Sequence, residues 1–489
     1  MARRQSDIRD KLGSNMISSR SLASNFSIQL VGKALSVVIG LIVVAIITRS
    51  LGAEAFGEYT TAVTYLQMFG VVVDFGLTLT LIVMISEKGV DEDRVVGNFF
   101  GLRLVSGFLL FSLAPLSVLA FPWSSTIQQA VLVGALAYFF MGGATMLVGI
   151  FQKHENLWRA AVAELLNRAV LVILIGLAAY LSPGVVEMVA VSVVANAIWL
   201  IAMIKLAEPF VRVHPLFELS FWKHILSRSW PIAISIIFNL LYLKGDILFL
   251  AYFREQTEVG LYGVAYRIID VMTVLPTMFM GLVLPSLVAA WSSGRKQDFR
   301  RHVARTFDLF MIAVIPVVIG AQLVSTDLTI LIAGNEFAAS GPVLALLIVA
   351  LIGVFLGALW GHLVVALNKQ RLMTWGYIFV AIIAIAGYLW LIPDYGMWGA
   401  VWVTLVSEAI IAFLTFLVVY KTSGALPNLM VTGKALLAGG IMYLVLLPLS
   451  GLHVILMVLI GGVVYVIALF ALKAVSVNEL NALLKKPTV

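Results

Sequence analysis

The sequence predicts an all-α polytopic membrane protein with about fourteen transmembrane helices. Of its 489 residues, 62% are hydrophobic and 12% are charged, whereas soluble domains carry about 25% charged residues. The mean hydropathy is +1.05. Apolar stretches of about 20 residues, long enough to cross a bilayer, recur along the whole chain. The predicted spans are 26–47, 58–85, 98–120, 126–151, 160–181, 185–204, 230–252, 259–291, 306–324, 341–367, 372–392, 397–420, 433–449 and 452–472.

The two ends of this series need separate comment. The first span carries Lys33 and is longer than the apolar core of a secretion signal, so we expect no cleaved signal peptide. The last two spans are the shortest and could instead form a re-entrant hairpin, which would reduce the number of spans to twelve.

Basic residues are distributed very unevenly between the loops, which predicts the orientation of the chain. With a cytoplasmic N-terminus, 27 of the 32 Lys and Arg residues lie in segments on the cytoplasmic side. The outer loops hold only Arg49 and Arg254, and the spans hold Lys33, Lys244 and Arg267. Basic loops stay on the cytoplasmic side. We therefore expect a multi-pass protein of the inner (cytoplasmic) membrane, with both termini in the cytoplasm.

The same asymmetry explains the pI near 9.4 without nucleic acid as a partner. Cysteine is absent, which excludes disulfides, thiolate metal sites and Cys nucleophiles. No Walker-type phosphate loop occurs and no loop is long enough for a soluble catalytic domain, so we expect neither an ATP-driven pump nor an enzyme, and no cofactor or metal.

A weak internal repeat predicts two six-helix lobes. The pattern G-x-Y-x-x-A begins at Gly57 and again at Gly260, 203 residues later, each time at the start of a lobe's second span. Six spans per lobe make the repeat parallel, with a pseudo-twofold axis along the membrane normal and a central cavity between the lobes. The predicted parts are an N-lobe (1–204), a cytoplasmic linker (205–229), a C-lobe (230–420) and a tail with the last two spans (421–489).

Three segments carry a resemblance to a known family. They are RSLGAEAFGEY at 49–59 followed by DFG at 74–76, KGD at 244–246 with EVGLYGVAYR at 258–267, and PDYGMWGA at 393–400. Together they resemble the polysaccharide and O-antigen repeat-unit flippases of the multidrug/oligosaccharidyl-lipid/polysaccharide exporter superfamily. The resemblance covers nearly the whole chain.

This resemblance implies a role in lipopolysaccharide or exopolysaccharide biosynthesis. The expected substrate is an undecaprenyl-pyrophosphate-linked oligosaccharide, moved from the cytoplasmic to the outer leaflet by alternating access. Polysaccharide polymerase machinery is a further partner that the resemblance suggests, beside the bilayer itself.

Charges inside the spans need a partner or a function, because a charge at the bilayer centre costs about 3 kcal/mol. Lys33 and Asp74 lie at similar depth on either side of the first hairpin, so they either form a structural pair or Lys33 receives the pyrophosphate. Lys244 and Arg267 are level across the hairpin near residue 255, and both are predicted to bind the pyrophosphate. A neutralised structural network is the alternative, since Asp270 lies one turn from Arg267.

Release of a pyrophosphate requires its site to weaken, and buried carboxyls can provide this by taking up a proton or ion. The predicted counter-ions or coupling groups are Asp74, Asp246, Asp270 and Glu408. Arg49 and Arg254 at the outer helix ends are candidate gate residues, although ordinary snorkelling explains them as well. Pro276 and Pro285 make span 259–291 the candidate for a bending helix.

Two other functions fit parts of the sequence. A cation-coupled drug antiporter of the same superfamily would favour acids without cations in its cavity, and Lys244 and Arg267 count against it. A membrane-embedded transferase would need a catalytic acid at the cytoplasmic face, where the run Asp91 to Asp93 reads better as a solvated loop. A lipid II flippase is compatible with everything above.

Overall fold

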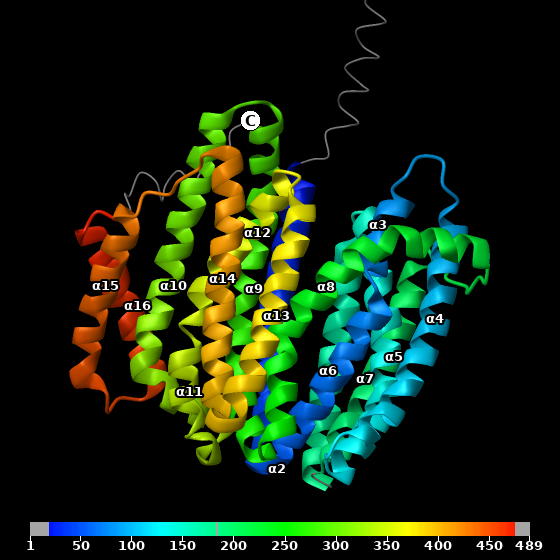
Figure 1. Cartoon of the computed structure of the whole chain (residues 1–489), viewed down its shortest axis with the longest axis horizontal. Helices are drawn as coiled ribbons and strands as arrows, with labels where there is room; N and C mark the ends of the chain where they lie inside the picture. The colour runs from blue at the N-terminus through cyan, green and yellow to red at the C-terminus, as the bar shows by residue number, and fades with distance from the viewer. Residues whose placement is uncertain (1–18, 182–183, 475–489) are drawn as a thin grey trace, which may run out of the picture. The chain divides into compact units, whose positions relative to one another are not determined.

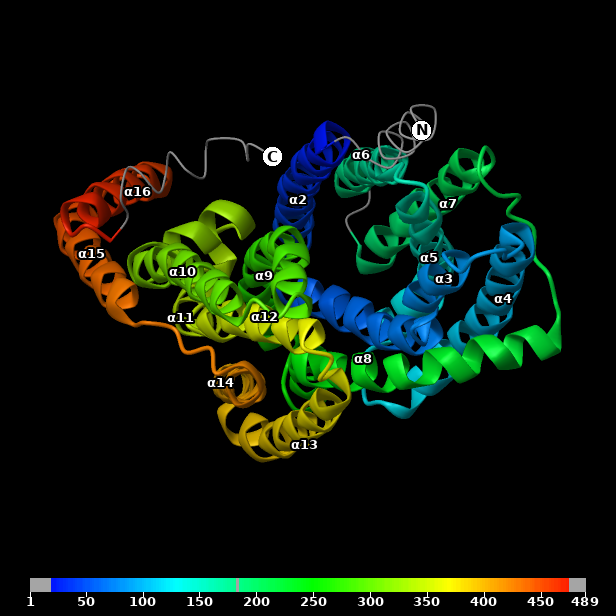
Figure 2. The same ribbon diagram turned by 90° about the horizontal axis from the view of Figure 1, so that it is seen from above.

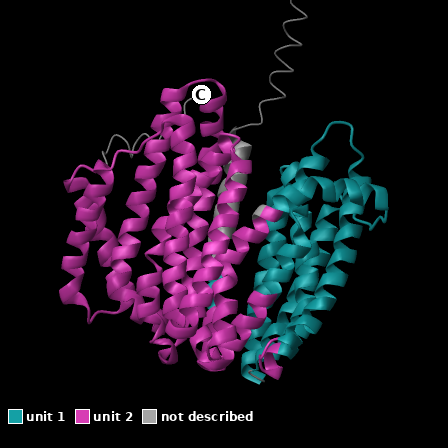
Figure 3. Ribbon diagram, in the orientation of Figure 1, with its two compact units in different colours: residues 1–43, 66–120, 128–233 teal, residues 44–65, 121–127, 234–489 magenta. Residues whose placement is uncertain are grey.

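The computed structural model describes residues 19–181 and 184–474, and within these ranges all regular structure is helical. Thirteen helices of the described part are long and apolar enough to cross a membrane. One of them, Val38–Ile85, contains the second predicted span and the end of the first, so the series agrees with the fourteen predicted. The chain divides into two compact units, which Figure 3 colours separately: residues 1–43, 66–120 and 128–233, and residues 44–65, 121–127 and 234–489.

The helices follow one another with short connections (Figure 1). The first part of the chain forms α2 (Ser19–Asp74), α3 (Leu77–Ile85), α4 (Glu92–Ser117), α5 (Ser125–Lys153), α6 (Leu157–Leu181), α7 (Val185–Ala207) and α8 (Leu219–Phe253). The second part forms α9 (Gln256–Ser292), α10 (Lys296–Ala333), α11 (Ser340–Leu347), α12 (Ala350–Ala366), α13 (Gln370–Tyr395), α14 (Met397–Ser423), α15 (Met430–Leu446) and α16 (Val454–Ala471).

Breaks in the first two spans lie at residues with positive φ. Gly52 (φ 77°) separates the two predicted spans that α2 joins. The second span is itself interrupted, because Phe75 (φ 45°) and Gly76 (φ 71°) are left-handed and separate α2 from α3. The sequence analysis treated 58–85 as one continuous span. The DFG motif at 74–76 is thus a helix break, which places Asp74 on the last turn before it.

Several other helix boundaries differ from the prediction. The length of an apolar stretch does not indicate how far a helix continues into the water beyond the membrane. Helix α10 begins at Lys296, ten residues before the predicted span, and takes up a basic segment that had been assigned to a loop. Helix α8 begins at Leu219, inside the predicted linker. The predicted span 341–367 is divided into α11 and α12.

The remainder of the predicted linker is held against α4 in the first unit. The backbone N–H of Leu216 donates to the Gly97 carbonyl (2.9 Å), and Arg212 N–H donates to Asp93 (2.9 Å). A Cβ on Gly101 would lie 2.0 Å from the Leu216 carbonyl oxygen. Small residues on α4 therefore let residues 208–218, which we call the strap, lie directly on the helix backbone.

The two glycines of the repeated motif pack against each other in the second unit. A Cβ on Gly57 would lie 1.8 Å from the Gln256 carbonyl oxygen, and a Cβ on Gly260 would lie 2.0 Å from that of Ala53. Gln256 follows Ala53 by the same 203 residues that separate the glycines. The contact is thus reciprocal, as expected for two copies of one motif across a local pseudo-twofold axis. Only glycine permits this approach of α2 to α9.

The last two helices are separate and pack beside α10 within the second unit, as Figures 1 and 2 show. Tyr465 on α16 donates to the Ile312 carbonyl on α10 (3.0 Å), and Gly439 on α15 brings that helix against Ile315 and Ile319. The 14-span prediction is therefore the correct one, rather than the 12-span alternative.

Helix α9 is 37 residues long and contains both Pro276 and Pro285.

Candidate functional site

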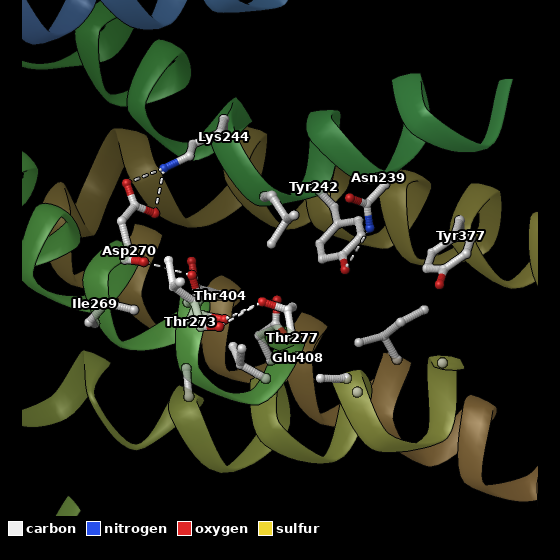
Figure 4. A pocket seen from close by; sticks show the side chains of 18 of the residues that line it. Asn239, Tyr242, Lys244, Ile269, Asp270, Thr273, Thr277, Tyr377, Thr404 and Glu408 are labelled. Atoms are coloured by element: carbon white, nitrogen blue, oxygen red, sulfur yellow. Dashed lines mark hydrogen bonds and ion pairs between the residues drawn. The ribbon is translucent and has the colours of Figure 1, made fainter. Parts of the chain in front are cut away.

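A cavity of about 540 Å³ lies within the second unit, between α8, α9, α11, α12, α13 and α14. Its α9 wall is one face of the helix, because the lining residues recur three or four apart from Tyr266 to Thr277. Polar groups on the other helices face the same space, as Figure 4 shows. They are Asn239, Tyr242, Lys244, His362, Tyr377, Thr404 and Glu408.

One end of this cavity holds an ion pair. Lys244 Nζ lies 2.8 Å from each carboxylate oxygen of Asp270, and 4.1 Å from the centre of the Tyr266 ring. The lysine side chain is 17% exposed and the aspartate 34%. The Tyr266 hydroxyl donates to the Leu243 carbonyl, which fixes the ring beneath the ammonium group. Lys244 is thus partly desolvated, neutralised and open to the cavity on one side.

Asp246, two residues further along α8, has a different environment. Its side chain is fully buried and accepts hydrogen bonds from Tyr262 Oη (2.5 Å), from the Ile247 N–H (2.8 Å) and from Thr404 Oγ1 (3.4 Å). These contacts link α8, α9 and α14 behind the cavity wall. Carboxylates with several donors are stable when buried, and this geometry is that of a packing group.

Glu408 lies near the middle of the cavity on α14 and is 5% exposed. Within the described ranges it has no hydrogen-bond or ion-pair partner. Gly353 of α12 packs directly against it, since a Cβ there would lie 2.8 Å from Glu408 Cβ. Opposite, Asn239 donates to the Tyr242 hydroxyl (3.1 Å). His362 is bonded through Nδ1 to the Ala358 carbonyl oxygen (2.7 Å).

Arg267, the strongest site candidate from the sequence, is not among the residues that line this cavity. It is half-buried on α9, and the described residues offer it no hydrogen bond or ion pair. Asp270, one turn away, faces Lys244 instead. Of these two cations, only Lys244 lines the cavity.

Asp74 forms an ion pair with a basic residue that had been counted on the cytoplasmic side. Arg103 on α4 lies 3.3 Å from Asp74, and it is only 5% exposed. Thr78 also donates to Asp74 (2.7 Å). The Lys33 side chain lies outside the described residues, so its predicted pairing with Asp74 is neither supported nor excluded.

The position of Arg103 corrects the count of charges. It lies eleven residues inside α4, within an apolar run, so it does not belong with the 27 basic residues counted on the cytoplasmic side. Gly142 of α5 makes room for its guanidinium, because a Cβ there would lie 2.9 Å from Nη2. The available signal was its place inside the predicted span 98–120, with apolar residues on both sides.

The two predicted gate arginines make different contacts within the second unit. Arg254 forms an ion pair with Glu258 (2.7 Å), whose other oxygen accepts from the Met397 N–H (3.1 Å). Glu258 raises the pKa of Arg254 further above its ordinary value by hydrogen bonding and charge. Arg49 donates to the Leu331 carbonyl (2.8 Å) and forms no ion pair with a carboxylate among the described residues. Both tie helix ends together.

Comparison with known proteins identifies the family. Residues 22–291, more than half of the chain, match the model of the family described as "Polysaccharide biosynthesis protein". A probable flippase of Haloferax volcanii is 28% identical over 241 residues, which cover 47% of this chain and 50% of that protein. The match thus spans about half the length of this relative. A probable low-salt glycan biosynthesis flippase of the same organism is 22% identical over 74% of this chain and 76% of its own length.

Solved structures show the same fold. The lipid II flippase MurJ in an inward closed conformation superposes with a TM-score of 0.74 at 14% identity, covering 91% of this chain and 97% of that one. An inward-facing multidrug resistance transporter of the MATE family superposes with a TM-score of 0.66 at 14% identity, covering 79% and 95%. The family match, the flippase relatives and this shared fold agree with the motifs at 49–76 and 244–267. The chain belongs to the polysaccharide biosynthesis protein family.

Proposed function

We propose that this protein is a flippase, which translocates an undecaprenyl-pyrophosphate-linked oligosaccharide, an O-antigen or exopolysaccharide repeat unit, from the cytoplasmic to the outer leaflet by alternating access. The observation that carries the proposal is Lys244, a partly desolvated cation at one end of a 540 Å³ cavity in a chain whose relatives are glycan flippases. A charge kept inside an apolar helix at this cost is by default functional.

In this proposal Lys244 holds a phosphate of the head group. Its ammonium has three donors, and two of them contact Asp270. The third is available to a ligand in the cavity. Arg267 and Lys33 are proposed as further phosphate-binding residues, which receive the head group in other conformations of the cycle. Arginine suits phosphate because its planar fork donates two parallel hydrogen bonds.

The acids have the opposite role. An anionic head group competes with Asp270 for Lys244, so the ion pair re-forms when the substrate leaves and favours release. Glu408, in the same cavity, and Asp74, paired with Arg103, are proposed to change their ionisation or partner during the cycle. Asp246 is the weakest of the four predicted coupling groups, because its three hydrogen bonds already stabilise it.

Arg254 and Arg49 are proposed to stabilise one closed state at the outer ends of the helices. The uneven distribution of basic residues supports an inner-membrane location with both termini in the cytoplasm. A flippase there would deliver its product to polymerase machinery on the outer face.

Reconstituted vesicles test this proposal. A labelled undecaprenyl-pyrophosphate oligosaccharide, lipid II and a cationic dye are supplied as alternative substrates, and the fraction that reaches the opposite leaflet or the lumen is measured over time. Lys244→Ala and Arg267→Ala should slow the oligosaccharide about tenfold or more, since each removes a charged hydrogen bond. Lys434→Ala, which removes a lysine of the same unit outside the cavity, is the control.

Asp270→Asn tests whether Asp270 competes with the substrate for Lys244. The variant lacks the competing carboxylate, so its apparent affinity for the oligosaccharide should increase while release of the oligosaccharide slows. Transport of the dye alone would establish a drug antiporter, and transport of lipid II alone a lipid II flippase. Wild-type rates in both cation variants would contradict the roles of Lys244 and Arg267.

A further inference from the structure

Glu408 is a buried acid without an ion-pair or hydrogen-bond partner among the described residues. It is 5% exposed and lines the 540 Å³ cavity. It also lines a second, almost wholly apolar cavity of about 670 Å³ between α10, α12 and α14. No other charged residue lines the second cavity among the described residues. Glu408 thus stands in the wall between a polar space and an apolar one.

An unpaired buried carboxyl is costly, so its retention calls for a ligand that satisfies it. Its position is also restricted. Gly353 lets α12 approach the Glu408 backbone, with a hypothetical Cβ only 3.0 Å from the Glu408 carbonyl carbon. The side chain therefore cannot move toward α12, and of the two cavities that it borders only the polar one offers hydrogen-bonding partners to its carboxyl group.

The polar cavity around Glu408 presents mostly neutral hydrogen-bonding groups. Tyr242 and Asn239 come from α8, Tyr377 from α13 and His362 from α12. Figure 4 shows the tyrosines, Asn239 and Thr277 around the same space as Glu408. The charged groups that line this cavity in the described structure are Lys244 and Asp270 at one end and Glu408 itself.

The separation of these charges limits what can bind. Thr404 contacts Asp246, two residues from Lys244, and it lies one helical turn from Glu408, about 6 Å along α14. A phosphate beside Glu408 would place two anions together. A sugar ring joined to a phosphate avoids this, since its hydroxyls can donate to the carboxylate while the phosphate reaches Lys244.

We propose that the cavity binds the glycosyl phosphate junction of the substrate, with Lys244 on the phosphate and Glu408 accepting hydrogen bonds from hydroxyls of the first sugar. This inference rests on the proposed function and adds a sugar-reading residue to it. The tyrosines and Asn239 complete the hydrogen bonds of the sugar, and their rings cover its apolar faces. Selection by a buried acceptor is strong, because a ligand without the matching hydroxyl leaves the carboxylate unpaired.

Soluble probes test the sugar site in the full-length protein. Binding of N-acetylglucosamine 1-phosphate, glucose 1-phosphate, inorganic phosphate and free N-acetylglucosamine to purified wild-type protein is measured by calorimetry. The sugar phosphates should bind about tenfold more tightly than inorganic phosphate, the size expected of a hydrogen bond to a charged acceptor. Lys244→Met should weaken every phosphate-containing probe.

Variants at Glu408 separate its role from anion repulsion. Glu408→Met keeps the volume but removes the acceptor, so the preference for sugar phosphate over phosphate should vanish. Glu408→Gln keeps one acceptor oxygen and should retain part of the preference. Val406→Met, on an exposed face of the same helix, is the matched control, and the unfolding temperature of each variant reports its folding.

Two results would overturn the inference. One is a wild-type preference retained by Glu408→Met. The other is equal tightening of phosphate and sugar phosphate in that variant, which would mean that Glu408 only repels anions. The vesicle assay separates this from failure of the proposed function. If the wild-type protein does not move the lipid-linked oligosaccharide, the proposed function is wrong. If the wild-type protein moves it, the KM of Glu408→Met is compared with that of the wild type for lipid-linked substrates that differ in their first sugar. Unchanged KM values would show that only the sugar site is wrong.

Discussion

Arg103 and Lys244 are each bound to an aspartate inside an apolar helix, but their surroundings differ. Arg103 is 5% exposed and its Nε and Nη1 lack hydrogen-bond partners in the described structure. Lys244 faces a cavity and has an aromatic ring beneath it. The first arrangement favours a structural pair with Asp74, and the second favours ligand binding.

Removing Arg103 should therefore destabilise the protein. Arg103→Ala leaves Asp74 without its cation, and breaking a buried pair costs about 3 kcal/mol. Thermal unfolding in detergent should show a clear decrease in the midpoint temperature. Replacing both partners, as in Arg103→Met with Asp74→Leu, should recover most of the loss, because apolar replacements often equal a buried pair. An unchanged midpoint in Arg103→Ala would show that the pair contributes nothing.

Glu218, at the end of the strap, predicts a dependence on pH. Hydrogen bonds from Arg94 and Asn98 lower the pKa of Glu218 from its ordinary value of 4.5 to about 2. Because the folded pKa is lowered, its stabilising effect is complete above pH 4.5 and is lost as the pH falls toward 2.

Hydrogen exchange of the Leu216 amide measures this effect. The wild-type protein should protect this amide more than Glu218→Gln does from pH 8 to pH 5, by the same factor throughout. The difference should shrink below pH 4.5. A difference that instead changes between pH 8 and pH 5 would assign the dependence to a group other than Glu218.

At the scale of elements, glycines determine where helices approach and where they break. Gly57 and Gly260 allow contact between α2 and α9, whereas Gly52 and Gly76 adopt positive φ at breaks. Gly57 and Gly260 are required because a side chain would not fit, whereas Gly52 and Gly76 are required because of their backbone conformation.

Alanine at Gly57 or Gly260 should be strongly destabilising. Each new Cβ would lie 2.0 Å or less from a backbone oxygen, which cannot rotate away as a side chain can. We expect losses of about 3 kcal/mol, at the upper end for overpacking. Gly176→Ala is the control, because a Cβ there meets nothing within 4 Å, and it should be neutral or slightly stabilising. Similar unfolding temperatures for all three variants would contradict the reciprocal contact.

At the scale of the whole molecule, the uneven distribution of basic residues remains after the correction for Arg103. The chain contains no cysteine, so single cysteines can test its orientation without background labelling. Glu255 and Ser293 are both exposed and flank the two ends of α9. They form a matched pair on opposite sides of the membrane.

A membrane-impermeant maleimide added to intact cells should label Glu255→Cys and not Ser293→Cys. After the membrane is opened with detergent, both should react. The physical reason is that basic loops remain on the cytoplasmic side, and Ser293 adjoins the basic start of α10. Labelling of Ser293→Cys in intact cells would reverse the predicted orientation.

The sequence by itself determined the class of protein, the number of spans and the repeat. Bilayer thickness and backbone hydrogen bonding leave few structures for a chain with apolar stretches of this length. The G-x-Y-x-x-A motif could be found because glycine is required wherever two backbones meet, and the resemblance to flippases rested on the same segments.

Only the tertiary structure decided which charges meet. Depth along a hairpin put Lys244 near Arg267, yet it could not show that Asp270 turns to Lys244, that Asp246 is enclosed by Tyr262 and Thr404, or that Asp74 finds Arg103. Pairing depends on helix rotation and on neighbours from distant parts of the chain, for which linear spacing holds no information. The cavity around Glu408 likewise exists only because α8 and α9 meet the four helices α11 to α14 there.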